Sequence, residues 1–330
     1  MSFANTAITD ILATTIENRS RKVADNVTSN NALLARLRAR GKVKTFSGGH
    51  KIIQELSFAE NANAGWYSGY DLLPVGVSDV ISAAEFTIKQ AAVPVVISGL
   101  EQLQNAGRER MIDLMEARIA VAEATMKNLI SDGIYSDGTG SNGKEIDGLE
   151  AAVPLDPTSD TYGNIGSATW TFWRNKYTDT SGLTTSTLQA AMNTLYAQLV
   201  RGSDRPDLLV GDNTMWGLYL GSLQAQQRFT NTDTADGGFQ SVKYMDADFV
   251  LDGGMYQGAI SGASGSPAGT IFFLNTDYLF FRPHARRNFV PLSPNKRYAV
   301  NQDAEVQILA WAGNMTCSGR MFQGRLDNNS

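Results

Sequence analysis

The longest stretch of helical periodicity in the chain covers residues 98–133. Ser98 and Glu101 have the S-x-x-E spacing of a capping box, in which each side chain binds a backbone N–H of the first turn. Gly107 interrupts the pattern and predicts a break between a short first helix and a longer second one. Gly133 predicts the end of the second helix. At 1.5 Å per residue this helix would be roughly 36 Å long, so we expect it to be the spine of the fold.

The apolar residues of this spine are spaced three and four apart, which places them in one stripe along one helix face. We expect the stripe to face the core, and Val121 is among the residues expected to widen it. The predicted spine-core residues are Ile112, Met115, Ile119, Met126 and Leu129.

Before the spine, two β-rich runs at residues 51–58 and 83–97 predict the strands of a long hairpin. Pro94 indicates an edge position rather than a central strand. The connection between the runs has neither a helical nor a strand period, yet it carries large apolar side chains. These tip residues are Trp66, Tyr67, Tyr70, Leu72 and Leu73. Because a two-stranded hairpin has no core of its own, the tip either folds back on its own subunit or docks on a neighbour; docking is the interpretation we favour.

Residues 148–300 have the pattern of a mixed α/β unit. The pattern predicts a helix at 186–200, another helix capped by Asp212 or Asn213, and strands in DLLVG, DFVLDGG and TIFFLNTDYLFFRP. Near the C-terminus, AEVQILAWAGNMTCSGRM predicts a long strand. We expect this strand to pack with the spine, so that residues 148–300 are inserted between them.

Composition and charge add a basic arm to this picture. Of the 330 residues, 42% are hydrophobic and only 18% are charged, below the usual quarter, which indicates that partners cover much of the surface. The net charge is −5, with +5 in residues 1–44 and −10 in the rest. Residues 5–40 predict two amphipathic helices, and the basic candidates of this arm are Arg36, Arg38 and Arg40. A solvated basic helix is the alternative interpretation.

No motif predicts catalysis, a cofactor or a metal. Gly138, Gly140 and Gly143 spell G-x-G-x-x-G, but the motif follows a helix instead of a strand and opens no helix. His50 and His284 each lack neighbouring ligands in the sequence. Asp246, Asp248 and Asp252 could line a weak calcium site, but the calcium-loop pattern is missing, and capped turns are the favoured interpretation. We therefore expect a protein that is not an enzyme.

The sequence also bears on location. Cys317 is the only cysteine, which favours folding in a reducing cytoplasm. The N-terminus lacks the pattern of a signal peptide, and no apolar run is long enough to cross a bilayer. We expect a protein that stays where it is made and has no membrane partner.

Four features in this order carry a resemblance: VVISGLEQLQNAG opening the spine, the hairpin at 46–97, EIDGLEAAV after the spine, and the return strand AEVQILAWAG. The chain resembles the major capsid protein of tailed bacteriophages, the Hong Kong ninety-seven fold. That resemblance implies an α+β fold whose parts have particular names. They are an N-terminal arm (1–44), an extended hairpin called the E-loop (45–97), a P-domain with the spine helix and following loop (98–147), a mixed α/β A-domain (148–300) and return strands of the P-domain (301–330).

The resemblance also implies a function. The subunit would self-assemble through hexamers and pentamers into the icosahedral head that encloses the phage genome, folding and assembling in the host cytoplasm and ending in the virion. Implied partners are a scaffolding protein, a portal, an optional decoration protein, and packaged DNA bound non-specifically on the inner face. The alternatives are an encapsulin-type compartment shell of the same fold and, from another class, an α/β enzyme.

Overall fold

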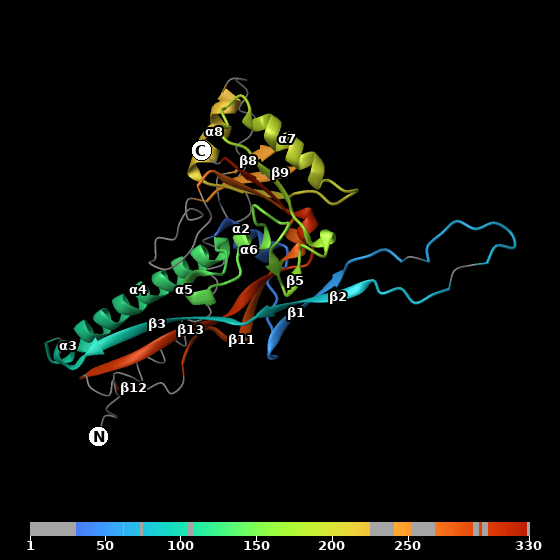
Figure 1. Cartoon of the computed structure of the whole chain (residues 1–330). Coiled ribbons are helices and arrows are strands. Elements are labelled where there is room, and N and C mark those ends of the chain that lie inside the picture. Colours follow the sequence, from blue (N-terminus) through green and yellow to red (C-terminus); the bar gives the residue numbers. More distant parts are fainter. Residues whose placement is uncertain are drawn as a thin grey trace.

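The computed structural model describes residues 31–61, 63–72, 75–104, 108–224, 241–252, 268–292, 297–298 and 303–328. Several expectations lie outside the described residues: the first helix of the arm, the break at Gly107, Leu73, and the side chains of Ile112 and Met115. Figure 1 shows a long helix beside long strands, a hairpin that extends away from the body, and a compact α/β unit. They occupy the residues expected for the spine, the E-loop and the A-domain, and these names are used below as labels for the three parts.

The spine packs on an antiparallel sheet. Its central strand is β13 (Ala304–Cys317), which pairs with β3 (Lys89–Ser98) on one side and with β11 (Leu279–Pro291) and β12 (Arg297–Tyr298) on the other. The long helix α4 (Arg108–Tyr135) lies along β3 (Figure 1). The late strand and the spine therefore form one unit, as predicted, and the strand that contains Pro94 is an edge strand among those described.

The predicted start of the spine is confirmed. The N–H of Ser98 donates to Glu101 Oε2 (3.1 Å), and the N–H of Glu101 donates to Ser98 Oγ (3.3 Å), which is a complete capping box. This box opens α3 (Gly99–Gln104), and α4 follows from Arg108. The Arg118 guanidinium of α4 binds the Glu101 carboxylate and the Val96 carbonyl. The two helices and the edge strand are thereby joined at one corner.

The predicted core residues in the centre of the spine are confirmed. Ile119 and Met126 are buried, and Leu129 is partly buried against the same core. Val121 is 67% exposed, so its assignment to the stripe was wrong; two residues from Ile119 correspond to about 200° around a helix.

The predicted end of the spine was also wrong. The helix continues through Gly133 to Tyr135, and Ile134 and Tyr135 are fully buried. A Cβ on Gly133 would contact Ile146 at 3.4 Å. This is an ordinary van der Waals distance, so Ile146 of the loop after the spine packs against the helix at Gly133.

Two long apolar runs divide where the sequence predicted single strands. Residues 83–97 contribute to β2 (Ile81–Thr87), which pairs with β1 (Lys51–Ser57), and to β3 of the other sheet. The run TIFFLNTDYLFFRP forms β10 (Thr270–Leu274) and then β11, with the turn η3 (Thr276–Tyr278) between them. In each case the chain leaves one sheet and enters another, which local apolarity does not reveal.

The A-domain is built on a six-stranded sheet. Its order is β6 (Lys176–Asp179), β14 (Gly324–Asp327), β10, β7 (Leu208–Gly211), β9 (Ala247–Leu251) and β8 (Ser241–Tyr244). Helices α7 (Leu188–Leu199) and α8 (Asn213–Gln224) contribute to its core, and Asp212 caps α8 by accepting from the Met215 N–H (2.9 Å). Both helices were predicted. The expected boundary at residue 300 does not separate the two sheets. The strand β11, which precedes it, joins the spine sheet, and the strand β14, which follows it, joins the A-domain sheet.

The remaining elements are short. They are α2 (Ala32–Ala39), α5 (Gly140–Gly143), α6 (Leu149–Ala152), β4 (Thr161–Tyr162), β5 (Ile165–Gly166), η1 (Thr171–Trp173) and η4 (Arg320–Phe322). Within the described ranges, no helix has both the length and the apolar character that a bilayer span requires.

Candidate assembly surfaces

The E-loop presents an uncovered apolar tip. Trp66 and Tyr70 are fully exposed, Leu72 is 97% exposed and Tyr67 is 67% exposed. Figure 1 shows the loop beyond β1 and β2 projecting away from the rest of the chain. The tip therefore does not fold back on its own subunit in this structure. Whether it docks on a neighbour stays a prediction.

The base of the E-loop, in contrast, is fixed to the body. Ala84 and Phe86 of β2 are buried against the β4–β5 hairpin, and the Glu85 N–H donates to the Gly163 carbonyl (2.9 Å). Gly163 has a φ of +60°, and a Cβ there would lie 2.8 Å from the Ala84 Cβ. The glycine permits this close contact. The base of the E-loop is therefore packed on the body, whereas the side chains of its tip are exposed.

A buried arginine holds the segments around that base. Arg320 is fully buried and donates to the Ala152 carbonyl (2.7 Å), to Ser167 Oγ (3.0 Å) and to Asp160 Oδ2 (2.7 Å). Its guanidinium also lies 5.1 Å from the centre of the Tyr162 ring. Sequence reasoning missed this residue, because an arginine near a strand end has no local signal that distinguishes it from a solvated one.

The second arm helix, α2, is attached to the body by its apolar face. Leu33, Leu34 and Leu37 are fully buried, as the amphipathic pattern predicted. Burial of each leucine stabilises the fold by about 1.5–3 kcal/mol. Asn31 caps the helix by accepting from the N–H groups of Leu33 (3.0 Å) and Leu34 (3.2 Å).

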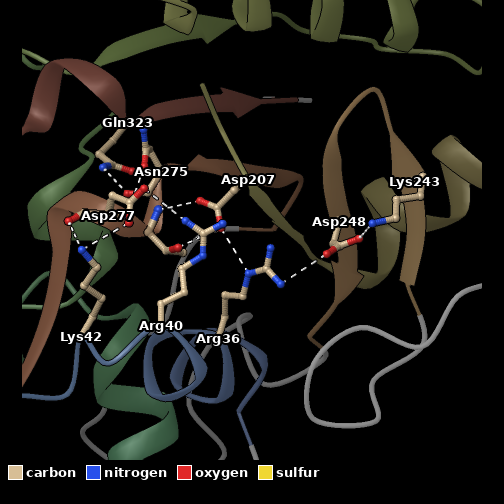
Figure 2. A network of polar contacts seen from close by, with 10 residues as sticks. Arg36, Arg40, Lys42, Asp207, Lys243, Asp248, Asn275, Asp277 and Gln323 are labelled. Carbon is tan, nitrogen blue, oxygen red and sulfur yellow. Dashed lines mark hydrogen bonds and ion pairs between the residues drawn. The ribbon is translucent and has the colours of Figure 1, made fainter. Parts of the chain in front are cut away.

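The basic face of α2 binds carboxylates of its own subunit. Arg36 Nε lies 3.2 Å from Asp207 Oδ2, and another Arg36 nitrogen lies 3.6 Å from Asp248 (Figure 2). Arg40 bridges Asp207 and Asp277 at 3.2 Å each. These acids lie next to or on β7 and β9 and in η3, so α2 lies across one end of the A-domain sheet.

Asp207 is the centre of this network (Figure 2). Besides the two arginines, it accepts from the Thr276 N–H (2.7 Å) and hydroxyl (2.8 Å). Arg36 and Arg40 thus bind carboxylates of their own subunit. The basic arm was predicted to act on a partner, and the structure gives Arg36 and Arg40 an internal role that the sequence did not indicate.

A polar cluster joins the end of the spine to α2 and to the residue after β9. The Tyr135 hydroxyl donates to Asp252 Oδ2 (2.6 Å), and Asn31 donates to the same oxygen (3.1 Å) and to Ser131 Oγ (3.0 Å). Asp132 is buried beside this cluster, and its Oδ2 has no hydrogen-bond partner among the described residues. Desolvation, and then the nearby Asp252 and Glu145 carboxylates, raise the pKa of Asp132 to about 6.

The other motifs of the sequence have separate surroundings. Asp246 pairs with Arg205, Asp248 with Arg36 and Lys243, and Asp252 with Tyr135. In the part of the chain that the structure describes, no three His, Cys, Asp or Glu side chains converge as metal ligands. The glycine-rich motif forms the short turn α5, in which Ser141 and Asn142 have positive φ.

Comparisons with known proteins show which solved structures share this architecture. No family model matches the chain, and no curated protein sequence matches it. A structure titled as the cyanophage A-1(L) capsid asymmetric unit has a TM-score of 0.63 at 16% identity, covering 87% of this chain and 90% of that one. The capsid of the native GTA particle has a TM-score of 0.60 at 14% identity, covering 90% of both chains.

A compartment shell shows the same architecture. The holo-SrpI encapsulin complex from Synechococcus elongatus PCC 7942 has a TM-score of 0.53 at 8% identity, covering 89% of this chain and 87% of that one. The likeness runs along nearly the whole chain in each comparison. The chain therefore has the α+β fold of tailed-phage major capsid proteins, which the encapsulin shares.

Proposed function

We propose that this chain is a major capsid protein, the structural subunit of an icosahedral phage head. In this proposal it self-assembles through hexamers and pentamers, encloses the genome and resides in the virion, with no catalytic role. A scaffolding protein, a portal and, optionally, a decoration protein would be its protein partners. In this proposal residues 1–44 are the arm, 45–97 contain the E-loop, 98–147 are the spine segment, 148–300 supply most of the A-domain and 301–330 supply the return strand β13. The bounds need correction at three strands, because β3 and β11 pair in the spine sheet and β14 pairs in the A-domain sheet.

The observation that carries the proposal is the exposed tip on a capsid-type fold. Trp66 and Tyr70 lie in the loop beyond a hairpin whose base is buried, and both side chains are fully exposed in the subunit. Large exposed apolar patches mark interaction sites. A closed shell offers such a tip a neighbour at every position, because the same contact repeats by symmetry.

The tip is large enough to matter for assembly. Each aromatic or leucine side chain that becomes buried contributes about 1.5–3 kcal/mol, before the ordering of the loop is subtracted. Since the tip is exposed in the isolated subunit, its removal should leave the free energy of unfolding nearly unchanged. Assembly and folding therefore respond differently to the same change.

The test replaces the apolar tip at constant length with W66S/Y67S/Y70S/L72S. We expect the purified variant to melt like the wild type in calorimetry and to form no closed shells in negative-stain images and light scattering. The control E60Q/S68A changes exposed polar residues of the same loop and should assemble normally. Wild-type protein that forms no shells or capsomers under any assembly condition would refute the proposed function.

An encapsulin-type shell is the second candidate, because the encapsulin likeness also extends over most of the chain. The two shells differ in what they contain. Particles from the native host that hold DNA, with portal and terminase genes beside this gene, would establish the phage head. Particles that hold a protein cargo would establish the compartment.

A further inference from the structure

A cavity of about 270 Å³ lies between the end of the spine helix α4, the strand β3 and the turn α5 (Figure 1). Its floor is apolar and includes Leu129, Ile130 and Ile146, of which Ile130 and Ile146 are buried. An apolar cavity of about 150 Å³ is large enough to hold benzene. This cavity therefore has room for a larger apolar group.

The turn α5 is fixed at the rim of the cavity. Lys89 of β3 binds the turn and the loop after it, because its Nζ donates to the Gly143 carbonyl (2.8 Å) and lies 3.2 Å from Asp147 Oδ1. The Glu145 carboxylate is also directed toward the turn, where a Cβ on Gly140 would be too close to it. The walls of the cavity are thus in place without a ligand, and most small-molecule sites are largely preformed in this way.

The rim of the cavity carries two polar side chains that bind nothing else in the described part of the subunit. Lys144 and Ser141 both line the cavity and are exposed, and neither has a polar partner among the described residues. Ser141 has a φ of +51°, which is uncommon for a residue other than glycine. The charge of Lys89 is balanced by Asp147, whereas the ammonium of Lys144 and the hydroxyl of Ser141 are available to a ligand.

We propose that this cavity binds a small aliphatic carboxylate, with its chain on the apolar floor and its carboxylate at Lys144 and Ser141. A carboxylate accepts hydrogen bonds from both an ammonium and a hydroxyl group, and the bond from the ammonium is strengthened by charge. An apolar lining with a few polar groups at one end is typical of small-molecule sites. This inference goes beyond the proposed function and does not depend on it, because every group of the site belongs to one subunit.

The two parts of the site make separate predictions about the ligand. Each buried CH₂ group strengthens binding by about fourfold, so octanoate should bind roughly 15-fold more tightly than hexanoate if both CH₂ groups reach the floor. The carboxylate instead depends on Lys144, which is exposed. An exposed ion pair contributes up to about fivefold in affinity, and the uncharged 1-octanol should gain nothing from it.

The experiment is calorimetric titration of unassembled subunits with octanoate, hexanoate and 1-octanol. We expect octanoate to saturate at one molecule per subunit. Variant A92W places a large side chain on an exposed lining position and should abolish saturable binding of octanoate. Variant K144E should weaken octanoate by about fivefold or more and change 1-octanol by less than about twofold. The control K176E reverses an exposed lysine outside the cavity and should bind octanoate like the wild type.

Thermal melting without ligand checks that each variant folds. Wild-type subunits that bind no octanoate would overturn the inference, and so would binding that A92W leaves unchanged, because the ligand would then lie elsewhere. Equal weakening of octanoate and 1-octanol by K144E would overturn the assignment of a carboxylate. Wild-type subunits that bind no octanoate, together with an A92W variant that melts normally but forms no shells, would assign this edge to a neighbouring subunit instead. The proposed function is tested separately, by shell formation of the wild type.

Discussion

Replacing Asp132 by Asn should stabilise the subunit at neutral pH. Asp132 lies in the last turns of the spine, buried, with Oδ2 unpaired and the carboxylates of Asp252 and Glu145 nearby. Asparagine has nearly the same shape without the charge. The substitution therefore removes an unfavourable charge while keeping the packing.

The magnitude follows from the shift. The pKa of Asp132 rises from an ordinary 3.8 to about 6 in the folded protein, a shift of about two pH units, which corresponds to roughly 3 kcal/mol. Because the folded-state pKa is the higher one, the native state holds the proton more tightly than the unfolded state. The stability that the protonated Asp132 contributes to the folded state is fully present below pH 3.8, declines as the pH rises, and is lost above about pH 6.

The assay is urea unfolding of unassembled subunits at several pH values from 4.5 to 8, comparing D132N with wild type at each. The difference between them should grow as pH rises through about 6, in favour of D132N, and then level off. Other carboxylates titrate equally in both proteins and cancel in the difference. The control D79N alters an exposed carboxylate and should show no such trend. A difference that is independent of pH, or that favours wild type above pH 7, would refute the reasoning.

Two further predictions concern the spine and the arm. Met126→Asp would bury an unpaired charge and should yield insoluble protein. The control Val121→Asp changes an exposed residue of the same helix and should remain soluble with a nearly normal melting temperature. Equal behaviour of the two variants would mean that the apolar stripe of the spine is misplaced. Arg36→Ala should lower the free energy of unfolding by about 1–3 kcal/mol, because it leaves Asp207 with fewer partners. The control Lys144→Ala changes an exposed lysine in the loop after the spine and should have a smaller effect. Chemical denaturation measures both variants, and equal losses would contradict an internal role for Arg36.

The sequence by itself determined the elements whose cause is local. The spacing of Ile119 and Met126 defined a helix face, the pair of Ser98 and Glu101 defined its start, and Pro94 indicated an edge strand. These predictions succeeded because helix periodicity, capping and the missing proline N–H act within a few residues of the chain. The exposed aromatic tip was visible in the same way, as apolar residues in a stretch with no period.

Only the tertiary structure decided which sheet each strand joins and what each charge binds. The run that became β10 and β11 is interrupted by the polar residues 275–277, but which sheet each half joins depends on partners from distant parts of the chain. Arg36 and Asp207 lie 171 residues apart in sequence, and nothing near either residue distinguishes a paired charge from a solvated one. Val121 was misassigned for a local reason instead, since it lies about 200° around the helix from Ile119. Local rules specify elements, whereas strand partners and ion pairs depend on the packing of distant segments.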